Sequence, residues 1–78
     1  MNKLLLVEYN ANHVIYQYTP EDSGEPGEVV FDVAIGEAVV RKRAQNDAYG
    51  KYGHNAAKRV SEYVAKKNLP MDAIQAWY

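Results

Sequence analysis

Cysteine is absent from this 78-residue chain, and histidine, tryptophan and phenylalanine occur only two, one and one times. Without thiols the chain cannot form a disulfide, a thiolate zinc site or a cysteine nucleophile. A small domain without such support depends on its hydrophobic core, or on association with another chain. The length excludes a second domain and most cofactor-binding folds. We therefore expect one domain over residues 1–78, with no cofactor and no metal.

Long hydrophobic runs are also missing. The apolar run at the N-terminus, Leu4 to Val7, is too short for a signal-peptide core or a membrane span. With 47% apolar and 24% charged residues, the composition is that of an ordinary globular domain. These observations predict a cytoplasmic protein that has no membrane partner.

A strong net charge is the third absence, because the formal charge is only −1. The two halves nevertheless differ: residues 1–40 hold seven acids and one base, whereas residues 41–78 hold eight bases and three acids. Opposed charges usually face each other across an interface, so we interpret this division as an acidic sheet that attracts a basic helix. The alternative interpretation is a basic surface that contacts nucleic acid.

Strand-forming residues fill four short segments of the first half. They predict strands over 3–9, 13–19, 28–34 and 37–43, separated by turn-forming residues. Assigning every second residue of these strands to one side gives the more apolar sheet face, which we expect to pack against the helix. Its members are Leu5, Val7, Tyr9, Val14, Tyr16, Tyr18, Val29, Phe31 and Val33.

After Gln45 the apolar residues change to helical spacing. This pattern predicts a helix over about 47–67, with Asn46 or Asp47 as its N-cap and Pro70 beyond its end. The side expected to be buried holds Tyr49, Tyr52, Ala56, Val60 and Tyr63.

The tail, residues 73–78, fits a short helix or a fifth strand. We favour a strand antiparallel to the first one, because six residues cannot form a stable helix alone. The expected fold class is α+β: a four-stranded antiparallel meander, extended by a C-terminal strand in the favoured interpretation, with one long helix on one face. Its segments are the meander (1–45), the helix (46–68) and a C-terminal tail or edge strand (69–78).

The second sheet face mixes aliphatic and polar residues, which is unusual for a face exposed to water. We interpret it, with the aromatic C-terminus, as an interface for a second copy of the chain or for another protein. The candidate interface residues are Leu4, Leu6, Ile15, Val30, Trp77 and Tyr78. The main hypothesis is therefore a non-catalytic protein–protein interaction or self-association module.

Two alternatives stay open. The first is a nucleic-acid-binding module that uses the basic 41–67 segment and its interleaved tyrosines, although the pI near 6.1 argues against it. The second is a small enzyme with an unidentified substrate, since His13 and Asp32 are expected on one sheet face and could form a general-base pair. The candidate nucleic-acid contacts are Arg41, Lys42, Arg43, Lys51, Lys58 and Arg59.

Three short motifs carry a resemblance. Gly36-Glu37, Asp47-Ala48-Tyr49 and the ending from Pro70 to Trp77-Tyr78 stand in an order that resembles a set of small uncharacterised bacterial proteins. The resemblance spans residues 28–78. It favours a complete small protein over a fragment, and it implies no activity, cofactor or site residue.

Overall fold

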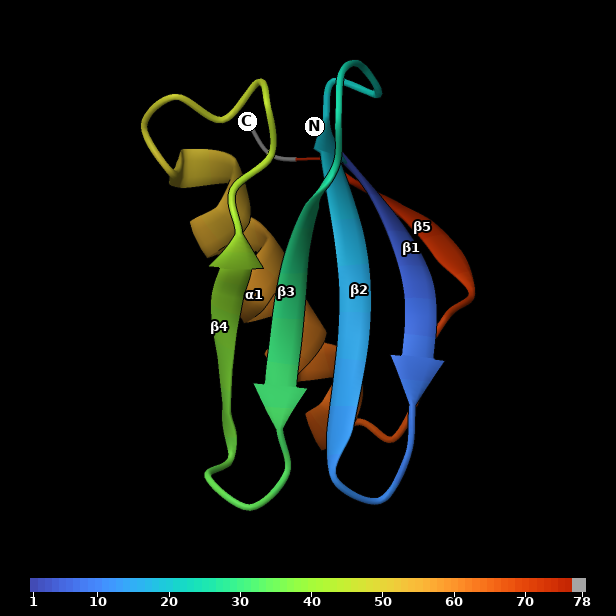
Figure 1. The fold of residues 1–78 in the computed structure, drawn as a ribbon. Helices are drawn as coiled ribbons and strands as arrows, with labels where there is room; N and C mark the ends of the chain where they lie inside the picture. Colours follow the sequence, from blue (N-terminus) through green and yellow to red (C-terminus); the bar gives the residue numbers. More distant parts are fainter. Residues whose placement is uncertain (77–78) are drawn as a thin grey trace.

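Strand-forming segments of the first half and of the tail build one antiparallel sheet, and the helical segment packs on one side of it (Figure 1). The computed structural model describes residues 1–76. The strands lie in the order β4-β3-β2-β1-β5, so β4 and β5 are the edges of the sheet. The predicted α+β fold class is confirmed. The elements are β1 (Asn2–Tyr9), β2 (His13–Pro20), β3 (Gly27–Asp32), β4 (Glu37–Lys42), α1 (Lys51–Ala65) and β5 (Asp72–Gln75).

β5 confirms that the tail forms a strand. It pairs antiparallel with β1, where Asn2 lies opposite Gln75. Both side chains are buried, and Asn2 Nδ2 donates a hydrogen bond to Gln75 Oε1 at 3.1 Å. Gln75 Nε2 also donates to the carbonyl of Asn55 in α1 at 2.8 Å. Polar side chains therefore tie the first and last strands to the helix.

The start of the helix differs from the prediction by four residues. α1 begins at Lys51, because Gly50 adopts a left-handed backbone with φ of 75° and serves as the N-cap. Asp47 still satisfies the first helical turn, since its carboxylate accepts the backbone N–H groups of Tyr52 at 3.1 Å and Gly53 at 2.8 Å. Tyr49 precedes the helix and is 97% exposed, so its predicted burial is wrong.

A β-bulge in β1 overturns the predicted face of that strand. Leu6 lies opposite Tyr16 and Glu8 lies opposite Ile15, so Val7 is an extra residue with no partner on β2. An extra residue reverses the alternation on the far side of the bulge. Leu4 and Leu6 therefore face the helix, whereas Leu5, which was predicted to do so, is 45% exposed. The predicted helix-facing positions that are buried in the structure are Val14, Tyr16, Tyr18, Val29 and Phe31.

A buried polar contact joins the sheet to the start of α1. The Tyr18 hydroxyl donates to Asp47 Oδ2 at 2.9 Å and accepts the backbone N–H of Ala44 at 3.0 Å. Gly53 is required at this contact, because a Cβ there would lie 2.8 Å from Tyr18 Oη and 2.9 Å from Val40 Cγ2. Burial raises the pKa of the Tyr18 hydroxyl, which keeps its proton for the bond to Asp47.

The expected attraction between sheet and helix does not take the form of ion pairs. Within residues 1–76, the ion pairs join strand to strand, a strand or the N-terminus to a loop, or one helical residue to another, and none joins α1 to the sheet. No helix in this part of the chain combines the length and apolar character needed to cross a membrane.

Candidate functional site

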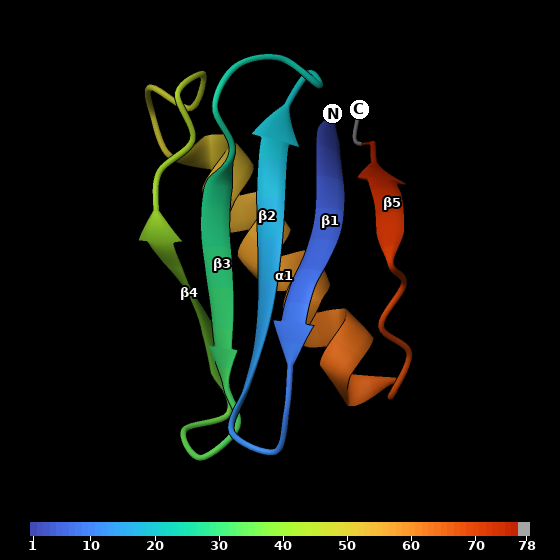
Figure 2. The ribbon, with the colours of Figure 1, turned by 45° about the vertical axis from the view of Figure 1, so that its right-hand side comes forward.

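The face of the sheet opposite α1, which we name the open face, is covered by no helix or strand among residues 1–76. In Figures 1 and 2 the helix lies behind the sheet, so the open face is turned towards the viewer. Ile15, Val30 and Val39 are direct neighbours across β2, β3 and β4 on this face. We name these three residues the apolar row. Ile15 is only 6% exposed but Val39 is 55% exposed, so the row runs from the centre of the sheet to an accessible edge.

A shallow hollow of about 260 Å³ lies beside the exposed end of the apolar row. Its lining is mainly apolar, and Ile35 in the β3–β4 turn adds a side chain that is 69% exposed. Charged residues of β3 and β4 border the hollow: Asp32, Glu37 and Arg41. The arrangement suits an apolar side chain that is accompanied by charged groups.

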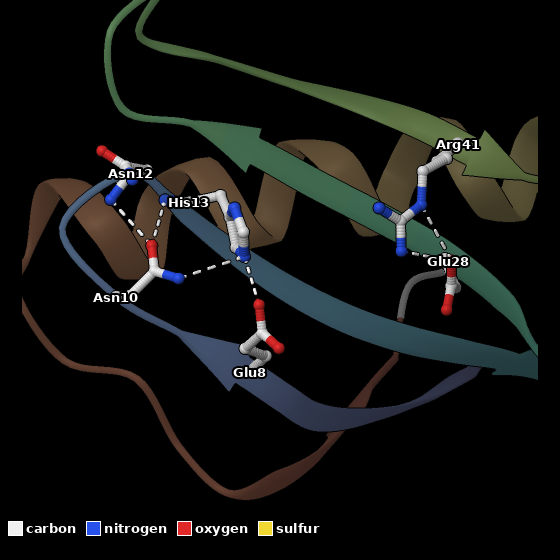
Figure 3. Close-up of polar contacts among 6 residues, drawn as sticks. All are labelled: Glu8, Asn10, Asn12, His13, Glu28 and Arg41. Atoms are coloured by element: carbon white, nitrogen blue, oxygen red, sulfur yellow. Dashed lines mark hydrogen bonds and ion pairs between the residues drawn. The ribbon is translucent and has the colours of Figure 1, made fainter.

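One ion pair lies at the end of β4 (Figure 3). Arg41 donates two hydrogen bonds to Glu28 Oε1, from Nε at 3.0 Å and from Nη2 at 2.8 Å. The Arg41 side chain is 54% exposed, and among residues 1–76 its Nη1 group makes no hydrogen bond. An arginine presents five N–H donors, so Arg41 keeps donors for a second carboxylate.

Glu37 is a carboxylate beside the hollow that has no cation partner among residues 1–76. It lies directly opposite Asp32 in the β3–β4 register, and like charges in that arrangement repel each other. The Asp32 carboxylate is occupied, because its Oδ1 accepts the backbone N–H groups of Ala34 at 2.9 Å and Ile35 at 3.2 Å. Within the described part of the chain, Glu37 takes part in no ion pair. A cation from outside the molecule would therefore relieve an existing repulsion.

His13 and Asp32, the candidate general-base pair, do not bond to each other. They lie directly opposite in the β2–β3 register, but the His13 ring contacts the Glu8 carboxylate and the Asn10 side chain (Figure 3). Asn10 Oδ1 also accepts the backbone N–H groups of Asn12 and His13, which closes the β1–β2 turn. His13 therefore takes part in the polar contacts that hold the β1–β2 turn. In residues 1–76, no group of three or more His, Cys, Asp or Glu side chains has a metal-binding arrangement.

The predicted interface residues separate into three groups. Ile15 and Val30 lie on the open face, as predicted. Leu4 and Leu6 were placed on this face wrongly: Leu4 is fully buried under the helix and Leu6 packs against the same core, because of the bulge in β1. Trp77 and Tyr78 lie outside the described residues.

Sequence analysis missed the part of the open face that β4 contributes. Glu37, Val39 and Arg41 alternate along the sequence with Ala38 and Val40, which is the signal that assigns them to one face. The three consecutive basic residues Arg41-Lys42-Arg43 were interpreted only by their charge, so this alternation was not recognised.

The six candidate nucleic-acid contacts do not form one surface. Arg41 lies on the open face, and Arg43 Nη1 donates to the carbonyl of Ala48 at 3.2 Å in the segment before α1. Lys42 is an exposed residue of β4 opposite Glu28. The remaining three contacts belong to α1: Lys51, Lys58 and Arg59.

Comparisons with models of protein families, with curated proteins and with solved structures found no match to this chain. The resemblance to small bacterial proteins therefore stays a prediction.

Proposed function

We propose that this domain is a non-catalytic protein–protein interaction module that associates with further copies of itself. The observation that carries the proposal is the apolar row, which crosses three strands on a face that α1 leaves uncovered. Single exposed aliphatic residues are common on protein surfaces and need no explanation. A contiguous row that reaches an edge strand is more typical of a contact surface.

The surroundings of the row support the same proposal. Leu5 and Ile74 add aliphatic side chains on the open face that are 45% and 64% exposed. A domain of this length without disulfides has only a small hydrophobic core. Contact with a second molecule would bury further apolar surface that the single chain leaves exposed.

Self-association is tested by sedimentation velocity on the purified chain at concentrations from about 10 μM to about 1 mM, the range of weak specific complexes. We expect the apparent mass to rise from 8.8 kDa towards twice that value. A mass that stays at 8.8 kDa over the whole range would refute self-association.

Nucleic-acid binding is the second candidate, because the outer side of α1 presents Lys51, Lys58 and Arg59 without a sheet carboxylate in ion-pair contact. Fluorescence anisotropy of a labelled oligonucleotide at low salt tests it. Binding that weakens with added salt and in Lys51→Ala/Lys58→Ala would support this function. Unchanged anisotropy at low salt would exclude it.

A further inference from the structure

We propose that two copies of this chain pair through their β4 edges, antiparallel, with Val39 opposite the partner's Val39. This inference rests on the proposed self-association and names its surface and register. The product is a ten-stranded sheet with two cross-edge ion pairs, in which Glu37 of each copy meets the partner's Arg41.

β4 is the edge that offers a template for pairing. It forms the outer strand of the sheet beside β3, and Figure 2 shows no element on its outer side. An edge strand exposes backbone N–H and C=O groups that can pair with another strand. The opposite edge, β5, has only four residues, and its one charged residue, Asp72, has no basic residue in the strand to meet in a second copy.

Symmetry restricts the register. A twofold axis perpendicular to the sheet makes the two β4 strands antiparallel and keeps both helices on the same side. Side chains that lie opposite each other then come from the same face, so Glu37 can meet only an open-face residue of the partner. Centring the pair on Val39 brings Glu37 opposite the partner's Arg41, and it does so twice. Centring it on Ala38 would bring Glu37 opposite the partner's Val39 and would leave the carboxylate without a cation.

The charges of β4 fit this register. Glu37 already faces the Asp32 carboxylate on its inner side and has no cation among residues 1–76. Arg41 bonds to Glu28 through Nε and Nη2 and keeps Nη1 for the partner's Glu37. The β4 strand of each chain therefore supplies one carboxylate without a cation and one arginine with spare donors, at positions that antiparallel pairing brings together.

The apolar residues fit as well. Val39 of one copy would continue the apolar row into the partner's Val39 and the rest of its row, across the new strand boundary. On the helix side, a second hollow of about 340 Å³ lies between β4 and α1 and is lined by Ala38, Val40 and Ala57, among others. The same register would place the partner's Val40 opposite Ala38, at the mouth of this hollow.

Stacking two open faces on each other is the competing arrangement, and charge disfavours it. On the open face five acids outnumber the bases, so two such faces would set an excess of negative charge against itself. The acids are Glu8, Glu28, Asp32, Glu37 and Asp72, and the basic residues are Lys3, His13, Arg41 and Lys42. Edge pairing instead sets acid against base.

The contact is short. Arg41 has no partner on β3, since Val40 lies opposite Val29 and Lys42 lies opposite Glu28, and this bulge ends the regular part of the edge. About five residues a side bury less than the roughly 1,200 Å² of a stable interface, so the dimer should exchange rapidly.

A charge-exchange experiment tests the register. Glu37→Lys alone and Arg41→Glu alone each replace two attractive pairs with two repulsive ones, and we expect the dimer association constant to fall at least about fivefold in each. An equal mixture of the two variants restores both pairs in the heterodimer, and sedimentation velocity should again show the dimer. Asp72→Lys, on the other edge, is the control and should dimerise like the wild-type chain.

The outcomes separate this inference from the proposed function. A wild-type chain that stays monomeric overturns both. A wild-type dimer that is insensitive to the variants, or variants that the mixture does not rescue, overturns the β4 register and leaves self-association standing.

Cross-linking gives a readout that needs no charge change. The chain has no cysteine, so Val39→Cys introduces a single thiol at the proposed twofold axis. Directly opposite residues lie about 4.5–5.5 Å apart between Cα atoms, which suits a disulfide. We expect Val39→Cys to form covalent dimers under mild oxidation several times faster than Ile74→Cys on β5. Equal rates would contradict the β4 edge.

Discussion

Replacing Gly53 with alanine tests the contact between α1 and the sheet. On helix propensity alone, Gly53→Ala should stabilise the protein by about 1 kcal/mol, because glycine is a poor residue inside a helix. The structure predicts the opposite. A Cβ at this position would lie 2.8 Å from Tyr18 Oη, 2.9 Å from Val40 Cγ2 and 3.1 Å from Asp47 Oδ2. The first two distances are shorter than real Cβ contacts and the third is tight, so at least one of these packed side chains or the helix must shift.

The magnitude follows from two opposing effects. Overpacking a well-filled core costs about 1–3 kcal/mol, and disturbing the buried bond from Tyr18 to Asp47 costs about 1–3 kcal/mol. Subtracting the propensity gain of about 1 kcal/mol leaves a net loss of about 1–5 kcal/mol, centred on about 3 kcal/mol, in the free energy of unfolding.

The assay is urea denaturation followed by circular dichroism, with the free energy of unfolding extrapolated to water. His54→Ala, at the next and exposed helix position, is the matched control and should change stability by less than about 0.5 kcal/mol. A Gly53→Ala protein as stable as the wild type, or more stable, would refute the close approach of α1 to Tyr18.

Three further predictions concern the core. Asp47→Ala should lower the unfolding free energy by about 2–4 kcal/mol in urea denaturation, because it leaves a buried tyrosine hydroxyl and two helix N–H groups without their acceptor; a loss below about 0.5 kcal/mol would contradict this role. Leu4→Ala should cost about 2–5 kcal/mol but Leu5→Ala less than about 1 kcal/mol, and equal losses would contradict the bulge in β1. Burial raises the pKa of Tyr16 from 10.0 to about 12, so the unfolded state loses this proton first and the unfolding free energy should fall by about 2 kcal/mol as pH rises from 10 to 12. Tyr16→Phe should reduce this decrease in the unfolding free energy, measured by urea denaturation at each pH. A variant with the same decrease between pH 10 and 12 as the wild type would contradict the prediction.

Residue periodicity was sufficient to predict the elements of this protein. The strand segments alternate with a period of two and the helix with a period of 3.6, and these periods depend only on local backbone geometry. Val14, Tyr16 and Tyr18 face the helix as expected, because β2 alternates without interruption. The strand in the tail was also predicted correctly, since too few residues were left for a helix.

β1 shows where local pattern fails. Leu4, Leu5, Leu6 and Val7 are all apolar, so the run contains no alternation that assigns a face. The bulge at Val7 is set by how β1 pairs with β2, a contact between distant segments. The start of α1 is a similar case, because Asp47, which accepts a hydrogen bond from the distant Tyr18 hydroxyl, lies in the turn that precedes the helix.

For the candidate interface on β4, too, the sequence accounts for one part and the tertiary structure for the other. The sequence alone contains the alternation that places Glu37 and Val39 on one face of β4, because alternation is local, although sequence analysis did not use it. Only the tertiary structure decided that Glu37 lies opposite another carboxylate while Arg41 bonds to Glu28 with donors to spare. The physical reason is that the electrostatic environment of a strand residue depends on its neighbours across the sheet, and strand pairing, register and bulges choose those neighbours.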